Sequence, residues 1–155
     1  MGASPISGVH VKSLKVITDE RGRLFEVLRN DEELGKRFGQ VYCTTVNFGV
    51  VKGWHLHKRQ IDNFVCVAGT IKLVLYDGRA DSPTHGQIDE FFLGIYSPLL
   101  VQIPAGVYHG FKGISEPEAI VINVPTEPYH HDAPDEYRVD PHDNDIPYKW
   151  ERVDR

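Results

Sequence analysis

The sequence predicts an all-β domain, a sandwich or barrel of short strands with little helix. Short runs of β-branched and aromatic residues recur along residues 11–124, and turn signals separate them at intervals of about 8–12 residues. The chain has no internal repeat and no long helical period. A chain of 155 residues can bury one full core, so we expect a single domain over residues 10–155 behind a flexible leader at 1–9.

The expected strands follow one another closely along the chain. Segment 70–76 is the clearest, because Ile71, Leu73 and Leu75 would share one face of an extended strand. The other expected strands cover residues 11–16, 23–29, 41–46, 54–57, 64–67, 91–93, 99–103, 107–111 and 119–124. Tight turns are expected at 19–22 and 104–106, with a polar loop at 77–86.

Two segments depart from the strand pattern. Asn30 followed by Glu33 resembles a capped helix start, and Gly35 and Gly39 limit the helix to one or two turns. Residues 125–149 are rich in Pro, Asp, His and Tyr and show no period. This segment predicts an irregular C-terminal tail that wraps the sheet, because it retains several tyrosines that can pack.

The composition excludes some classes of function. A net charge of −5 without a basic block argues against nucleic acid as a partner. No apolar run approaches the roughly 18 residues of a membrane span, and no signal-peptide segment is visible, so we expect a cytoplasmic protein. Cys43 and Cys66 lie in apolar strand-like runs, which predicts two buried free thiols in a reducing compartment.

The histidines at positions 55 and 57 are the first sign of chemistry. Residues two apart on a strand point to the same face, so Gly53, His55 and His57 would share one wall, with Trp54 and Leu56 on the other. Two imidazoles on one wall can bind a metal ion or move protons.

Two short motifs resemble those of the cupin superfamily. They are His55-x-His57 followed by Gly69, and Pro104-x-Gly106-x-x-His109. Further segments occur in the order of the dTDP-4-dehydrorhamnose 3,5-epimerase family, and they are residues 19–26, 52–55, 82–86, 103–111 and 146–150. The chain therefore resembles that family over residues 18–150. The segment at 55–58, His-Leu-His-Lys, is also similar to the dTDP-4-keto-6-deoxyglucose 3,4-ketoisomerases.

The resemblance implies a cupin jelly roll, or double-stranded β-helix, with an irregular C-terminal tail. It also implies a homodimer that acts on a nucleotide-linked 4-keto-6-deoxyhexose, with no metal and no other cofactor. By the same resemblance His55 is the catalytic base, Asp143 pairs with it, and His109 faces the sugar. Asn63 stands where the epimerases have a lysine at the site.

The nucleotide-binding residues are likewise implied by the resemblance. Arg21, Phe25 and Glu26 match residues that contact the nucleotide, often across a dimer interface. Lys52 stands where an arginine meets the diphosphate. Arginine is the better bidentate phosphate ligand, so lysine here indicates a looser grip or a different nucleotide.

One departure from the family concerns the acid opposite the base. The epimerases carry a tyrosine on the strand before the tail, whereas Ile122 or its neighbour occupies that position here. Tyr129, at the start of the tail, is the substitute that we consider.

The proposed reaction suits these side chains. A proton α to a ketone is acidic enough for a histidine, whose pKa is about 6.5, to remove near neutral pH. A carboxylate on the second ring nitrogen fixes the tautomer and stabilises the imidazolium. Donors near the carbonyl oxygen stabilise the enolate, and His57 and His109 are the candidates.

Three alternatives remain open. A 3,4-ketoisomerase would move protons between C3 and C4 through an enediol, and His55 with His57 suits that shuttle. A metal-binding cupin could use three imidazoles and one carboxylate, from His55, His57, Asp62 and His109. A cupin that binds nucleotide sugars without turnover would explain the missing tyrosine.

Overall fold

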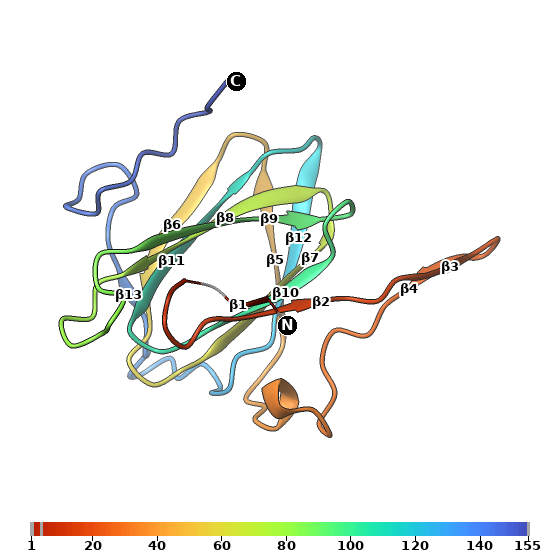
Figure 1. The fold of residues 1–155 in the computed structure, drawn as a ribbon, viewed down its shortest axis with the longest axis horizontal. Coiled ribbons are helices and arrows are strands. Elements are labelled where there is room, and N and C mark those ends of the chain that lie inside the picture. Colours follow the sequence, from red (N-terminus) through yellow and green to blue (C-terminus); the bar gives the residue numbers. More distant parts are fainter. Residues whose placement is uncertain (1, 4, 155) are drawn as a thin grey trace.

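The protein, described here by a computed structural model for residues 2–3 and 5–154, is built from two facing β-sheets. Figure 1 shows the sheets packed face to face, with the irregular C-terminal segment passing along one side. The prediction of an all-β jelly roll is confirmed. Among the described residues, no helix has the length and apolar composition to cross a bilayer.

The strands of each sheet are antiparallel to their neighbours. The six-stranded sheet contains, in spatial order, β1 (Gly2–Ala3), β2 (His10–Ser13), β10 (Leu99–Ile103), β7 (Asp62–Ala68), β12 (Glu118–Asn123) and β5 (Tyr42–Asn47). The five-stranded sheet contains β13 (Tyr137–Arg138), β6 (Val51–Leu56), β11 (Val107–Gly113), β8 (Thr70–Asp77) and β9 (Ile88–Gly94).

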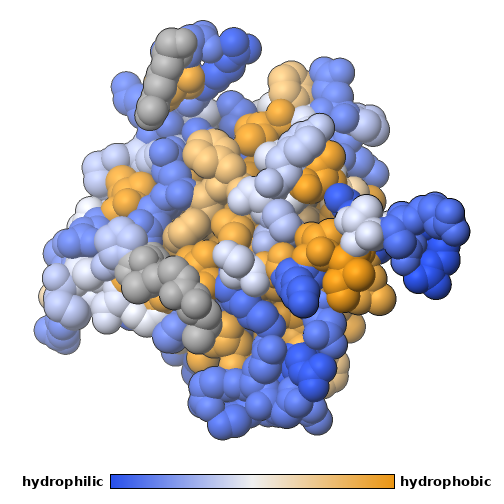
Figure 2. Space-filling view, turned by 45° about the vertical axis from the view of Figure 1, so that its right-hand side comes forward, coloured by the Kyte–Doolittle hydropathy of each residue, from blue (hydrophilic) through white to orange (hydrophobic). Residues whose placement is uncertain are grey.

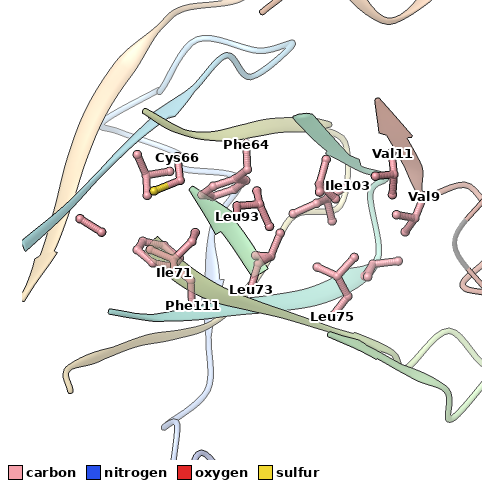
Figure 3. Close-up of a cluster of buried hydrophobic side chains, with 14 of the residues drawn as sticks. Val9, Val11, Phe64, Cys66, Ile71, Leu73, Leu75, Leu93, Ile103 and Phe111 are labelled. Carbon is pink, nitrogen blue, oxygen red and sulfur yellow. The ribbon is translucent and has the colours of Figure 1, made fainter. Parts of the chain in front are cut away.

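The main core lies between the two sheets. The predicted alternation on β8 is present, since Ile71, Leu73 and Leu75 are fully buried in the largest apolar cluster. Figure 3 shows Leu73 of β8 and Phe64 of β7 pointing into the same space. Burial of apolar area is worth about 25 cal/mol per Å², so this shared interior holds the two sheets together.

The tail covers the outer face of the five-stranded sheet. Trp150 is buried against Trp54 of β6, with ring centroids 5.0 Å apart, and Tyr148 packs edge-on to both rings. This confirms that the irregular tail wraps the sheet, and the tail also supplies β13, which pairs with β6 at His55.

The N-terminal half differs from the sequence prediction at the strand expected over 23–29 and at the expected helix. The strand expected over 23–29 is only β4 (Gly22–Leu24), which forms a two-stranded hairpin with β3 (Ile17–Asp19). Apolar residues after it pack onto a small cluster with Leu34 instead of pairing as a strand. The expected capped helix is a single 3₁₀ turn, η1 (Glu33–Gly35), and the residue before it is Glu32, not Asn30.

The segment expected to be a flexible leader is instead packed on the domain where the structure describes it. Ile6 is 1% exposed and Val9 is also buried, both in the main cluster. Arg79 donates from Nη2 to the carbonyl oxygen of Ser7 at 2.7 Å. Apolar burial at Ile6 is a long-range contact that local patterning could not reveal.

Of the two free cysteines, Cys66 is buried as expected and Cys43 is exposed. The prediction for Cys43 was wrong because β5 is the edge strand of its sheet.

Candidate active site

A cavity of about 890 Å³ opens beside β5, β6 and the start of the tail. Several side chains that matter below line it, namely Tyr42, Lys52, His55, His57, Tyr129 and Glu136. The cavity has the size of a small-molecule site. Both sheets contribute to its wall, because β5 belongs to one sheet and β6 to the other.

His55 lies on β6 and is half-buried in the cavity wall. Its Nδ1 lies 3.9 Å from Oε1 of Glu136, which precedes β13 and is also bound by Arg138 at 3.0 Å. Burial is the main cause that lowers the pKa of His55 to about 4, and the charge of Glu136 opposes it. At neutral pH the ring is therefore uncharged and can accept a proton from a group in the cavity.

His57 and His109 meet at one buried carboxylate. Nε2 of His57 lies 3.2 Å from Oδ2 of Asp62, and Nε2 of His109 lies 3.1 Å from the same oxygen. The other oxygen of Asp62 accepts from Gln60 Nε2 at 2.7 Å and from Asn123 Nδ2 at 3.0 Å. Asp62 is 1% exposed, so two amide donors and two imidazole nitrogens surround a carboxylate that has almost no access to water.

The second nitrogen of each ring is also occupied. Nδ1 of His57 faces the carbonyl oxygen of Asp135, and Nδ1 of His109 faces that of Val107 at 3.2 Å. A carbonyl oxygen only accepts, so each Nδ1 carries the hydrogen. Each Nε2 faces an ionised carboxylate, which requires a proton or a metal ion between the two atoms.

The electrostatics favour protonation of His57. Burial works against its charged form, but the hydrogen bond and the charge of Asp62 outweigh burial and raise the pKa of His57. Burial likewise opposes ionisation of Asp62, but bonds to the two histidines hold its pKa well below the usual range. Both nitrogens of His57 are therefore occupied, which does not fit its expected part in a proton shuttle.

Three expected site residues are not brought to the cavity surface. Asp143 is exposed, and its backbone N–H donates to Asp140 Oδ1 at 2.8 Å. The carboxylate that faces His55 is that of Glu136 instead. Asn63 points to the opposite face of β7 from Asp62 and is bound to Val124 O and Gln102 Nε2. His109 is buried behind the wall, next to His55 and His57.

The expected nucleotide-binding residues lie away from this cavity in the same chain. Arg21 is at the tip of the β3–β4 hairpin, paired with Asp19, and Glu26 pairs with Arg29. Phe25 is half-buried on the small cluster below the hairpin. The hairpin extends well beyond the two sheets (Figure 1).

Lys52 and Tyr129 line the cavity, and their predicted roles stay predictions. Nζ of Lys52 donates to Thr44 Oγ1 at 3.0 Å, so the ammonium lies between β5 and β6. Tyr129 is 45% exposed, and its ring packs edge-on to His131.

Sequence reasoning missed Glu136 and Tyr42 and gave Asp62 only a metal-ligand role. Glu136 lies two residues from Arg138 of β13, and no local pattern shows that β13 would pair with β6. Tyr42 lies within an expected strand, but its position across from Asn123 depends on the register of β5 with β12.

Comparisons with known proteins point to one family. A family model described as dTDP-4-dehydrorhamnose 3,5-epimerase matches residues 3–155. The chain is 42% identical over 136 residues to a probable low-salt glycan biosynthesis epimerase from Haloferax volcanii, covering 86% of this chain and 87% of that protein. It is 39% identical over 145 residues to a spore coat polysaccharide biosynthesis protein from Bacillus subtilis, covering 94% and 96%.

Solved structures show the same likeness. A dTDP sugar isomerase from Desulfovibrio desulfuricans G20 superposes with a TM-score of 0.90 at 31% identity, covering 97% of this chain and 95% of that one. A dTDP-4-dehydrorhamnose 3,5-epimerase from Elizabethkingia anophelis superposes with a TM-score of 0.81 at 27% identity, covering 98% and 86%.

We predict that Asp62→Asn lowers the free energy of unfolding by about 3–5 kcal/mol, because it removes the buried carboxylate that faces both His57 and His109. The lowered pKa of Asp62 means that the carboxylate stabilises the fold above about pH 4 and that this is lost as the pH falls. The raised pKa of His57 means that its contribution is present below about pH 6.5 and is lost as the pH rises through the folded value. The deficit should therefore be largest between those limits.

Urea unfolding of both proteins across pH 4–9 measures this difference. Asp143→Asn is the matched control, because that side chain is exposed, and it should change stability by less than about 0.5 kcal/mol. Equal effects of the two substitutions would contradict the central role of Asp62.

Proposed function

The chain belongs to the dTDP-4-dehydrorhamnose 3,5-epimerase family, and on that premise we propose that it inverts a carbon next to the ketone of a nucleotide-linked 4-keto-6-deoxyhexose. The observation that carries the proposal is His55, an uncharged imidazole in the wall of a cavity, with a carboxylate on its far side. We expect the protein to act in the cytoplasm on a soluble substrate.

His55 removes the proton in this mechanism. Its Nδ1 side is turned to Glu136, so Nε2 is the nitrogen that meets the substrate. When Nε2 takes the proton, the ring becomes an imidazolium, and the charge of Glu136 stabilises it. The enolate that forms lies near His57, whose charged form is favoured by Asp62 and would act through space because both ring nitrogens are occupied.

The diphosphate is bound by cations of the same wall. Lys52, Arg59 and Arg138 line the cavity and offer a point charge and two planar guanidinium groups. This set supports an anionic substrate even though the whole chain is acidic.

Epimerisation is favoured over the 3,4-ketoisomerase alternative by the state of His57. A ketoisomerase would need a second group that both accepts and donates a proton next to His55. His57 has no free nitrogen for that exchange, since one nitrogen faces a carbonyl and the other faces Asp62.

We further propose that the active protein is a homodimer in which the β3–β4 hairpin reaches the cavity of the partner. The hairpin carries Ile17 and Leu24 as an exposed cross-strand pair, and apolar side chains gather beside the protruding hydrophilic segment in Figure 2. A second chain would cover these side chains and bring Arg21, Phe25 and Glu26 to a nucleotide.

A metal-binding cupin is the second candidate function. The ligand atoms of His57, Asp62 and His109 lie within 4.8 Å of one another. Both histidines donate from Nδ1 to a backbone carbonyl, which is the arrangement of a metal-bound imidazole. These three residues would hold the ion, and it would polarise a bound oxygen as a Lewis acid.

The first prediction for the proposed function concerns proton exchange. In D₂O the protein should incorporate deuterium at C3 or C5 of dTDP-4-keto-6-deoxyglucose and form a new isomer, both followed by NMR. His55→Asn should abolish both, at least about 100-fold, because the general base is lost. Binding without any exchange by the unaltered protein, with this and other nucleotides, would show a binding protein without turnover.

The second prediction concerns the carboxylate beside the base. The free enzyme loses its base when His55 is protonated. Because the pKa of His55 is lowered to about 4, kcat/KM should fall as the pH drops through about 4, and this fall is the acid limb of its pH profile. Glu136→Gln removes the charge that raises this pKa, so the limb should move to lower pH. The maximal rate should also fall at least about tenfold, or about 1.4 kcal/mol. Asp143→Asn is the control, and a larger loss there would restore the pairing expected from the sequence.

The third prediction tests the dimer. Arg21→Ala and His55→Asn chains, each with a different tag, are expressed together and purified through both tags. If Arg21 serves the partner's cavity, one of the two sites in each hybrid is intact, and activity should be about half that of the unaltered dimer. A hybrid no more active than its parents would place Arg21 in its own chain's site or outside any site.

The fourth prediction separates the two candidate functions. Elemental analysis of protein purified without chelator should show no stoichiometric Fe, Mn or Zn if protons occupy the His57–Asp62–His109 cluster. One equivalent of metal that is lost in Asp62→Asn would favour the metal-binding cupin.

A further inference from the structure

The hydroxyl of Tyr42 is held by a hydrogen bond from the neighbouring strand. Tyr42 lies on β5 directly across from Asn123 of β12, and Nδ2 of Asn123 is 2.8 Å from the Tyr42 oxygen. Tyr42 lines the cavity that contains His55, and 38% of the residue is exposed. This group has no part in the mechanism described so far.

The orientation of the Asn123 amide follows from its other contacts. Its Oδ1 accepts the backbone N–H of Asn63 at 2.9 Å, and a backbone amide can only donate. The amide nitrogen must therefore be the atom that faces both Asp62 and Tyr42, and its two hydrogens are shared between them. Tyr42 consequently accepts this hydrogen bond and does not donate it.

The hydrogen of the Tyr42 hydroxyl is thereby left for another acceptor. Within the described part of the chain, the Asn123 contact is the only hydrogen bond of that hydroxyl. Burial, followed by the charge of Asp62, raises the pKa of Tyr42 to about 12, so the phenol keeps its proton at neutral pH. The group is a protonated acid with its hydrogen free, at the wall of the cavity.

Tyr42 and His55 reach the cavity from different sheets. β5 is the edge strand of the six-stranded sheet, and β6 belongs to the five-stranded sheet. A sugar ring in the cavity would meet His55 on one side and Tyr42 on another. Inversion at carbon needs this arrangement, because one group removes the proton and a second group returns a proton to the other face.

We infer that Tyr42 is the catalytic acid that delivers a proton to the face of the enolate opposite His55. This inference rests on the proposed epimerase function. His55 Nε2 takes the proton from the carbon next to the ketone, and the C–H electron pair moves into the enolate. The enolate carbon then takes the Tyr42 proton, leaving a phenolate that the Asn123 N–H stabilises. The imidazolium loses its proton to water and the phenolate regains one, so no oxidant or reductant is needed.

The test separates proton removal from proton return. Tyr42→Phe deletes only the hydroxyl, and His55 can still remove a proton and return a deuteron to the same face. With dTDP-4-keto-6-deoxyglucose in D₂O, Tyr42→Phe should retain deuterium incorporation within about threefold of the unaltered enzyme, while formation of the inverted isomer falls about 100-fold or more. His55→Asn should lose both, and Tyr96→Phe, at an exposed site away from the cavity, should lose neither.

Each contrary result has a distinct meaning. Inverted product at an undiminished rate in Tyr42→Phe overturns the role of Tyr42. Retained deuterium incorporation with lost inversion in Tyr129→Phe also overturns it. A parallel loss of exchange and inversion in a Tyr42→Phe protein with an unchanged melting temperature also overturns it. If that variant is unstable, 3-fluorotyrosine at position 42 is the second test, because it keeps the shape of the side chain and lowers the pKa of the phenol. The alkaline limb of the inversion rate should then move to lower pH, and a limb that does not move overturns the role of Tyr42. Absence of exchange in the unaltered enzyme overturns the proposed function itself.

Discussion

The cavity depends on one buried carboxylate, that of Asp62. Removing a carboxylate from water costs several kcal/mol, and here two amide donors and two imidazole rings from different parts of the chain offset that cost. Asp62 and Asn123 belong to the six-stranded sheet, whereas His109 belongs to the five-stranded sheet and His57 directly follows its strand β6. The carboxylate therefore ties the two sheets together behind the cavity wall. It also orients His57 and, through Asn123, the hydroxyl of Tyr42.

The same interaction gives two neighbouring histidines opposite character. His55 and His57 are two residues apart on one wall, but burial lowers the pKa of His55 while the Asp62 carboxylate raises that of His57. Burial thus favours the neutral form of His55, whereas Asp62 favours the charged form of His57. Environments that push the pKa values of adjacent groups apart are typical of sites that perform acid–base chemistry. In the proposed mechanism, His55 can then act as a base beside a charge that stabilises the enolate, without competition between the two rings.

The tail contributes to both stability and chemistry. Trp54 and His55 point to opposite faces of β6, so packing of Trp54 against Trp150 fixes the strand that presents His55 to the cavity. The tail then returns along the edge of β6 as β13. In the backbone register of these two strands Arg138 is opposite His55, and Glu136 lies beside the His55 ring. A segment without regular period thus supplies the carboxylate partner of the base.

The all-β class, most strand positions, the wrapping tail and the family could be predicted from the chain alone, because these depend on period-2 patterning and on motifs short enough to be local. Lys52 and Tyr129 also proved to line the cavity. The sequence could not show that Glu136, and not Asp143, faces His55. This contact depends on pairing between β13 and β6, which lie about eighty residues apart in the chain. The tertiary structure also placed Asn63 on the outer face of β7 and Tyr42 across from Asn123. A shift of one residue in strand register exchanges the two faces of a sheet, and long-range packing is what sets that register.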